Sequence, residues 1–239
     1  MSIIFVLTLF IFDISYQIYL LLSKKFKDFY QIIIFLFFSL LLVFLIFGTL
    51  NWGTFLAIAM FSWIFSGNFI DMVYQSSQVK ELKSVLLRRL GMISAHLGTA
   101  FLILGVGIVT TFSLEREVIL QKGESYQLGS TNFVFKEIRE SKGLNYSIQS
   151  AVIEIRKGGL VDEISAEKRN YLSSNQIMTE AAIKPTLLQD YYVTLGDQVG
   201  DGKWSFKLQI KPFIRWIWFG AILIALGTFV SSFRQTKRL

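Results

Sequence analysis

The chain contains one histidine, His96, inside an apolar segment that is long enough to cross a membrane. Its imidazole has two ring nitrogens that need partners, and a bilayer core holds no water to supply them. Ionisable side chains at that depth are costly, usually face the interior of a helix bundle and often have a function. Two interpretations follow from the position alone: a hydrogen bond to a neighbouring helix, or an axial bond to a metal or haem iron.

A single histidine supplies one axial ligand, so a bis-histidine haem needs a second histidine from another chain or another copy of this chain. Other site chemistry finds few residues. The chain has no cysteine, which excludes disulfides and thiolate sites. It has no nucleophile elbow and no phosphate loop, and it lacks the ligands for a zinc or di-iron centre. Asp13 and Asp71 lie near helix ends and do not form the charged pathway expected of a transporter subunit.

Small residues recur on one face of the helix that carries His96. They let a neighbouring helix, or a flat ring, approach the backbone closely, and plain helix packing is the simpler interpretation. The residues are Gly91, Ala95, Gly98 and Gly105.

Composition indicates which elements position these residues. The chain is 53% hydrophobic, with a mean hydropathy of +0.51, which is typical of several membrane spans. We predict a polytopic α-helical membrane protein with about five transmembrane helices: a four-helix region at 1–112 with a partly helical inside loop at 75–90, and a last helix and inside tail at 213–239. The apolar segments are approximately Ile3–Leu22, Gln31–Leu50, Trp52–Tyr74, Gly91–Phe112 and Phe213–Phe233.

The net charge of +7 lies at the ends of these segments and does not indicate a nucleic-acid partner. All the basic clusters fall on one side if the N-terminus and the region between the last two segments lie outside and the C-terminus lies inside. Arg88 and Arg89 belong to this positive-inside anchor; the functional alternative is a contact with a haem propionate or a lipid phosphate. The clusters are Lys24, Lys25 and Lys27; Lys80, Lys83, Arg88 and Arg89; and Arg234, Lys237 and Arg238.

Residues 113–212 are predicted to form an outer β domain inserted before the last helix. Apolar residues alternate in Lys203–Lys211, and Gly158-Gly159 is typical of a hairpin turn. We expect a small antiparallel sandwich or barrel of six to eight strands. Other strand-like segments are Asn132–Ile138, Asn145–Arg156, Leu160–Ile164 and Gln189–Leu195.

Six short sequence strings occur in order between His96 and Gly220: His96-Leu97-Gly98, Ser113–Glu117, Glu167–Tyr171, Met178–Ile183, Asp190–Gly196 and Lys211–Gly220. From about Arg88 to Trp218 the chain closely resembles the C-terminal part of the CcmF family, the membrane haem-lyase subunit of the c-type cytochrome maturation system. The first three spans fit the family's hydropathy but carry no motif.

The resemblance implies a function. Family members receive haem from a membrane-tethered haem chaperone on the outer face. They help to attach it to the Cys-x-x-Cys-His motif of apocytochrome c. The implied partners are therefore the haem chaperone, apocytochrome c and its thiol-handling subunit. Family members also hold a haem b between two transmembrane histidines, and His96 falls where the family has the second. The resemblance therefore implies that His96 is an axial ligand to a haem b shared with a histidine from a partner chain.

Complete family members are much longer and carry, upstream, further histidines and a tryptophan-rich haem-handling segment that Trp52-Gly53 and Trp63 do not reproduce. We expect this chain to be the product of the C-terminal half of a split gene and to be inactive without an N-terminal CcmF half. The mitochondrial inner membrane is favoured over a bacterial inner membrane, because split versions are mitochondrial and the Phe and Ile content suits an AT-rich organelle genome. The alternatives are a non-catalytic assembly scaffold and, less favoured, a transporter subunit.

Residues within the matching strings are candidates for contacts with partners. Those of the outer domain line a haem-transfer cleft or build the fold, and the charged ones are expected to pair at the surface. Those at the start of the last helix are expected to form an interfacial aromatic anchor, with a contact to haem or the partner half as the alternative. The candidates are Glu167, Lys168, Arg169, Tyr171, Thr179, Glu180, Arg215, Trp216 and Trp218.

Overall fold

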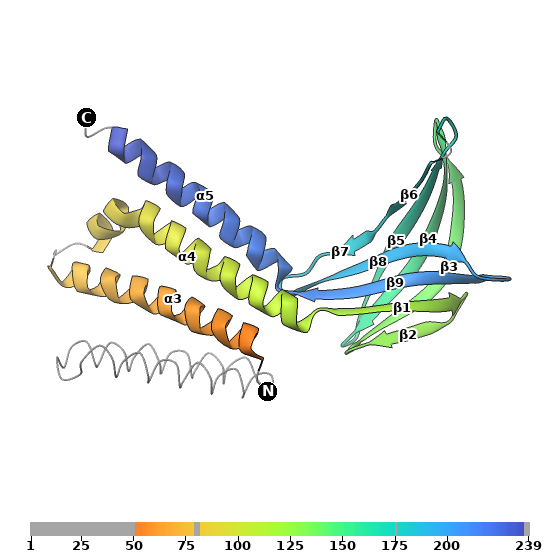
Figure 1. Ribbon diagram of the computed structural model, residues 1–239, viewed down its shortest axis with the longest axis horizontal. Helices are drawn as coiled ribbons and strands as arrows, with labels where there is room; N and C mark the ends of the chain where they lie inside the picture. Colours follow the sequence, from red (N-terminus) through yellow and green to blue (C-terminus); the bar gives the residue numbers. More distant parts are fainter. Residues whose placement is uncertain (1–50, 79–81, 175, 237–239) are drawn as a thin grey trace. The chain divides into compact units, whose positions relative to one another are not determined.

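The computed structural model describes residues 51–78, 82–174 and 176–236 of the chain. The two predicted spans Ile3–Leu22 and Gln31–Leu50 lie outside the described residues. The chain divides into a helical unit and a β unit, Phe112–Phe213 (Figure 1).

The helical unit contains α3 (Trp52–Gln78), α4 (Leu82–Phe112) and α5 (Ile214–Thr236). Asn51 caps α3, because its Oδ1 accepts hydrogen bonds from the backbone N–H groups of Gly53 (2.9 Å) and Thr54 (3.3 Å). In the described part of the chain, two segments are long and apolar enough to cross a membrane, Arg89–Phe112 and Ile214–Phe233. The predicted count of about five transmembrane helices therefore stays a prediction.

The polar segment predicted as the inside loop 75–90 is mostly helical. Helix α3 continues to Gln78 and α4 begins at Leu82. Hydropathy marks where a helix leaves the apolar layer and not where it ends, and Lys and Arg are good helix formers.

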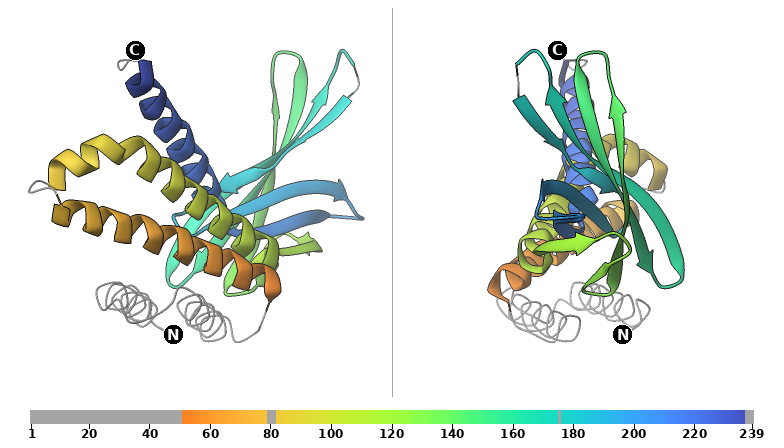
Figure 2. Two further views of the ribbon diagram at one scale, coloured as in Figure 1. Left: turned by 60° about the vertical axis from the view of Figure 1, so that its left-hand side comes forward. Right: turned by 90° about the vertical axis from the view of Figure 1, so that its right-hand side faces the viewer.

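Helix α4 lies between α3 and α5 (Figure 1 and the left view of Figure 2). A Cβ on Gly98 would lie 2.6 Å from the carbonyl oxygen of Gly220, and a Cβ on Gly227 would lie 2.5 Å from that of Gly91. On the other side, Gly107 of α4 faces Ala57 of α3. Glycines therefore set both helix contacts.

The β unit is an antiparallel sandwich of two sheets, with strand orders β1-β9-β8-β7 and β2-β3-β4-β5-β6. Nine strands occur among the described residues, more than the six to eight predicted. The short strands β2, β6 and β7 lack an alternating pattern of useful length. The strands are β1 (Leu114–Gln121), β2 (Ser125–Leu128), β3 (Thr131–Lys142), β4 (Tyr146–Lys157), β5 (Leu160–Tyr171), β6 (Gln176–Glu180), β7 (Ala182–Lys184), β8 (Gln189–Gln198) and β9 (Lys203–Pro212).

The core of the sandwich comes from alternate residues of facing strands. In β9, Trp204, Phe206 and Leu208 are buried while the residues between them are partly exposed. The opposite sheet contributes Phe133 and Phe135 of β3, and the rings of Phe135 and Phe206 pack with centroids 4.9 Å apart. The period-two pattern read from the sequence is thus the pattern of burial.

The predicted hairpin turn joins β4 to β5. Gly158 and Gly159 have φ values of 54° and 83°, a left-handed backbone that glycine adopts without steric cost. At the other end of the sheet, the β3–β4 and β5–β6 hairpins project in the same direction beyond the rest of the sandwich (Figure 2). The rings of Tyr146 and Tyr171 link them, with centroids 5.3 Å apart.

Candidate functional site

His96 lies on the α3-facing side of α4 and lines a groove of about 420 Å³. The groove lies wholly within the helical unit. Its walls are Trp63, Ile64, Gly67 and Asn68 of α3, and Arg89, Met92, His96 and Thr99 of α4.

The His96 ring is held by one side-chain hydrogen bond. Its Nδ1 lies 3.3 Å from Oδ1 of Asn68, and the amide Nδ2 of Asn68 donates to the carbonyl oxygen of Ile64 at 2.8 Å. The second bond fixes the amide orientation, so the Asn68 oxygen is an acceptor and Nδ1 of His96 must donate the proton. Nε2 then carries a lone pair, and it has no hydrogen-bond partner among residues 51–78, 82–174 and 176–236.

The groove suits a flat, largely apolar group with one nitrogen ligand. A Cβ on Gly67 would meet nothing within 4 Å, so α3 leaves open space beside the His96 ring. In the described part of the chain, no group of three or more His, Cys, Asp or Glu side chains could hold a metal ion. A porphyrin iron takes four nitrogens from its ring, so the single imidazole of His96 is a donor that such a group could use.

A positive charge lies along the same wall of the groove. Arg89 precedes His96 by two helical turns and so lies roughly 10 Å away along α4, on the same face. This arrangement suits a ligand with an apolar body and an anionic edge. The side chain of Arg88, the other predicted contact, lies outside the described positions.

The small-residue stripe of α4 does not face this groove. Gly91 and Gly98 contact α5, and Ser94 donates to the carbonyl oxygen of Leu223 at 3.1 Å. Backbone atoms of α5 occupy the space that a flat ring would need on that face. Helix packing is therefore the function of the part of the stripe that contains Gly91 and Gly98.

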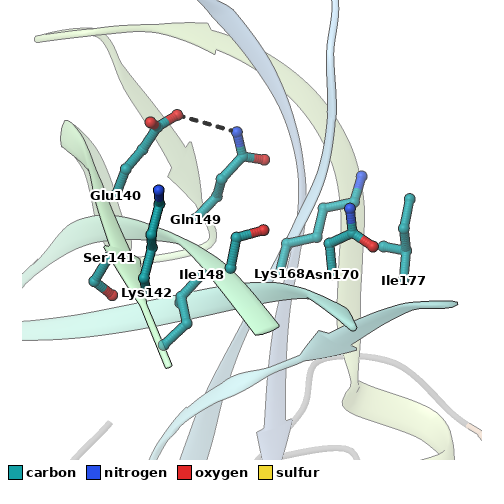
Figure 3. A pocket seen from close by; sticks show the side chains of 9 residues that line it. Glu140, Ser141, Lys142, Ile148, Gln149, Lys168, Asn170 and Ile177 are labelled. Carbon is teal, nitrogen blue, oxygen red and sulfur yellow. Dashed lines mark hydrogen bonds between the residues drawn. The ribbon is translucent and has the colours of Figure 1, made fainter. Parts of the chain in front are cut away.

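The β unit has a second hollow, about 370 Å³, on the inner face of β3, β4, β5 and β6 (Figure 3). Two of its lining residues are neighbours on adjacent strands, where Gln149 of β4 donates a hydrogen bond to Glu140 of β3 at 3.3 Å. Lys168 lines it and forms an ion pair with Asp197, whose carboxyl pKa is held below its usual value by that hydrogen bond. Thr179 lies opposite Lys168 in the β5–β6 register.

The remaining charged candidates of β5 and β6 lie on the other face of the sheet. Arg169 pairs with Glu167 (2.7 Å) and Glu180 (2.6 Å), and its guanidinium lies over the Tyr146 ring, 5.4 Å from the centroid. The hydrogen bonds that Arg169 donates to the Glu167 carboxylate, followed by the nearby charge of Glu180, raise the pKa of Arg169. The pairing that the sequence analysis favoured for these side chains is present.

The candidates on α5 separate into inward and outward groups. Trp216 packs on Phe101 of α4, with ring centroids 5.2 Å apart. Arg215 and Trp218 are exposed, Trp218 by 69%. Trp218 therefore has the exposure expected of an interfacial anchor, whereas Trp216 belongs to the packing of the helical unit.

Sequence reasoning missed the α3 side of the groove. Asn68 is a polar residue of the apolar helix α3, and its side chain is only 9% exposed. A buried amide in such a helix indicates a hydrogen-bond partner on a neighbouring helix. Its signal was present in the sequence, but only the structure pairs it with His96.

The chain is similar to known proteins of one family, and a family model matches its β unit. The family model described as the CcmF C-terminal beta-sandwich matches residues 111–212. The cytochrome c-type biogenesis protein CcmF of Haemophilus influenzae is 42% identical over 149 residues, which cover 62% of this chain and 23% of the relative. CcmF of Escherichia coli is 37% identical over 152 residues, 62% of this chain and 24% of the relative.

CcmF of Pseudomonas fluorescens extends the match to 81% of this chain at 30% identity, and again only 30% of the relative is covered. The chain thus spans less than a third of the length of these relatives. A solved structure, cytochrome c heme lyase CcmF, has the same fold with a TM-score of 0.70 and 18% identity, over 85% of this chain and 34% of that one.

Proposed function

This chain is related to the C-terminal part of the CcmF cytochrome c-type biogenesis proteins, and residues 111–212 belong to their C-terminal β-sandwich family; we propose from this relationship that it is a membrane subunit of a cytochrome c haem lyase. In this proposal it binds haem b and assists covalent attachment of haem to the Cys-x-x-Cys-His motif of apocytochrome c. The activity belongs to the complex and not to this chain alone.

One observation carries the haem-binding part of the proposal. Nε2 of His96 has a lone pair and no partner among the described residues, in a segment apolar enough to cross a membrane. Leaving such an atom unsatisfied in an apolar layer is unfavourable, whereas a bond to haem iron satisfies it. The open space at Gly67 lies in the groove that His96 also lines, and it leaves room for a ring.

Four residues of the groove would hold the haem. His96 would bind the iron through Nε2, Trp63 and Met92 would cover apolar surface and exclude water, and Arg89 would pair with a propionate. When bound, the haem supplies an iron that accepts and releases one electron. A second histidine ligand would come from a partner chain, since this chain has no other histidine.

The partners follow from the same relationship. Segments of a complete CcmF protein that this chain does not contain, including the tryptophan-rich haem-handling segment, are contributed by an N-terminal CcmF half. The β unit offers a surface for the haem chaperone, apocytochrome c and its thiol-handling subunit. The location is an inner membrane with the β unit outside and the C-terminus inside. We favour the mitochondrial one, although the relatives compared are bacterial.

The test is an absorption spectrum of the complex purified through a tag on this chain. We expect a reduced b-type haem spectrum in the wild type and its loss in His96→Ala. His96→Gly should regain the spectrum when imidazole is added, because free imidazole enters the vacated position. Mass spectrometry of the co-purifying subunits should identify the N-terminal half.

Ser94→Ala is the matched control. Ser94 is two residues from His96 but bonds to α5, so this variant should keep the haem. An unchanged spectrum in His96→Ala would assign the ligand to another chain and leave this one as an assembly scaffold. A wild-type complex without haem would refute haem binding altogether.

A further inference from the structure

We propose that Asn68 is a positioning residue that sets the tautomer and the electron donation of His96, and through them the redox potential of the bound haem. This inference rests on the proposed function, since it takes His96 as the haem ligand. It adds a role for a residue of α3 that neither the sequence motifs nor the relationship to known proteins assigns.

Among the described residues, the Asn68 side chain bonds to His96 and otherwise only within its own helix. Its side chain is 9% exposed, its Nδ2 donates to the backbone of the preceding turn, and its Oδ1 is 3.3 Å from Nδ1 of His96. Because Nδ2 is engaged, the amide cannot turn over without losing a 2.8 Å bond to Ile64. Whenever Nδ2 of Asn68 keeps its bond to Ile64, the atom that faces the imidazole of His96 is therefore Oδ1, which is a hydrogen-bond acceptor.

An acceptor at Nδ1 has two consequences for the ligand atom. It keeps the proton on Nδ1, so that Nε2 is always available to bind iron. It also polarises the N–H bond and increases the electron density at Nε2, as carboxylates and carbonyls do beside other metal-bound histidines. A neutral amide gives an intermediate effect: a carboxylate would donate more strongly and an apolar side chain not at all.

This graded chemistry predicts shifts of opposite sign. Asn68→Asp keeps the shape and strengthens the acceptor, so it stabilises the oxidised iron and lowers the midpoint potential. Asn68→Leu removes the acceptor, so it raises the potential and weakens haem retention roughly tenfold or more. A residue that only packed α3 against α4 would not give shifts of opposite sign.

The experiment is a spectroelectrochemical titration of the complex purified through this chain, with wild type, Asn68→Asp and Asn68→Leu measured together. Electron paramagnetic resonance g-values of the oxidised haem report the same change without turnover. Ser66→Ala is the control, because Ser66 is a buried polar residue of α3 whose hydroxyl bonds only within its own helix. Its potential should equal that of the wild type.

The result expected is a lower potential in Asn68→Asp with haem content kept. An unchanged or raised potential in Asn68→Asp would overturn the inference, and this variant keeps the test valid if Asn68→Leu does not assemble. Failure of the proposed function is separate: haem retained in His96→Ala would remove His96 as ligand, whatever the Asn68 variants do.

Discussion

Gly67 is a position where the lack of a side chain has a predicted consequence. A Cβ there would meet nothing within 4 Å, and the open space adjoins His96 and Asn68 in the groove. Gly67→Leu should therefore fill the groove and reduce haem content several-fold. Replacing glycine inside a helix also favours the helix by up to about 1 kcal/mol, so the fold should not suffer. The ratio of haem to protein and the thermal midpoint, measured together, separate the two effects.

The size series gives the control for this prediction. Gly67→Ala adds one methyl group and should lose less haem than Gly67→Leu. Full haem content in Gly67→Leu would show that the ligand of His96 does not lie against α3.

At the scale of elements, the glycines between α4 and α5 predict that replacing glycine by alanine destabilises the helix packing, whereas the same replacement at Gly67 does not. A Cβ on Gly98 would lie 2.6 Å from the Gly220 carbonyl oxygen and 2.7 Å from the Ile224 nitrogen, both backbone atoms that cannot move aside. Gly98→Ala should therefore cost about 1–3 kcal/mol of overpacking, more than the gain in helix propensity. Unfolding in mixed micelles measures this cost.

Gly67→Ala is again the matched variant, because its methyl group meets open space. If Gly98→Ala and Gly67→Ala unfolded at the same denaturant fraction, the result would contradict the close contact between the backbones of α4 and α5.

The difference between these two glycines shows what the sequence could and could not predict. Period-two alternation in β9 and the Gly158-Gly159 turn were predictable, because strand burial and hairpin turns depend on neighbours in the chain. That Gly98 faces a helix and Gly67 faces a groove depends on residues far away along the chain. The same reason hid Asn68: its partner is 28 positions away, on another helix.

On the scale of the whole molecule, the helical unit and the β unit have chemically different surfaces, and this difference predicts how the chain is oriented. The outward side chains of α5 are large and apolar, among them Trp218, Phe229 and Phe233. The strands instead expose ion pairs such as Lys207 with Glu115 (2.6 Å) and Lys184 with Asp162 (2.5 Å). The first surface suits lipid and the second suits water.

The basic residues in the last turn of α5 and just after it then predict on which side of the membrane the β unit lies. Arg234, Lys237 and Arg238 should remain inside, which puts the β unit outside. An epitope inserted at the exposed Gly158-Gly159 turn should be cleaved completely by protease added to intact mitoplasts or spheroplasts. An epitope after Leu239 should survive until detergent is added. Cleavage of the C-terminal epitope in sealed membranes would contradict this prediction and show that the β unit lies inside.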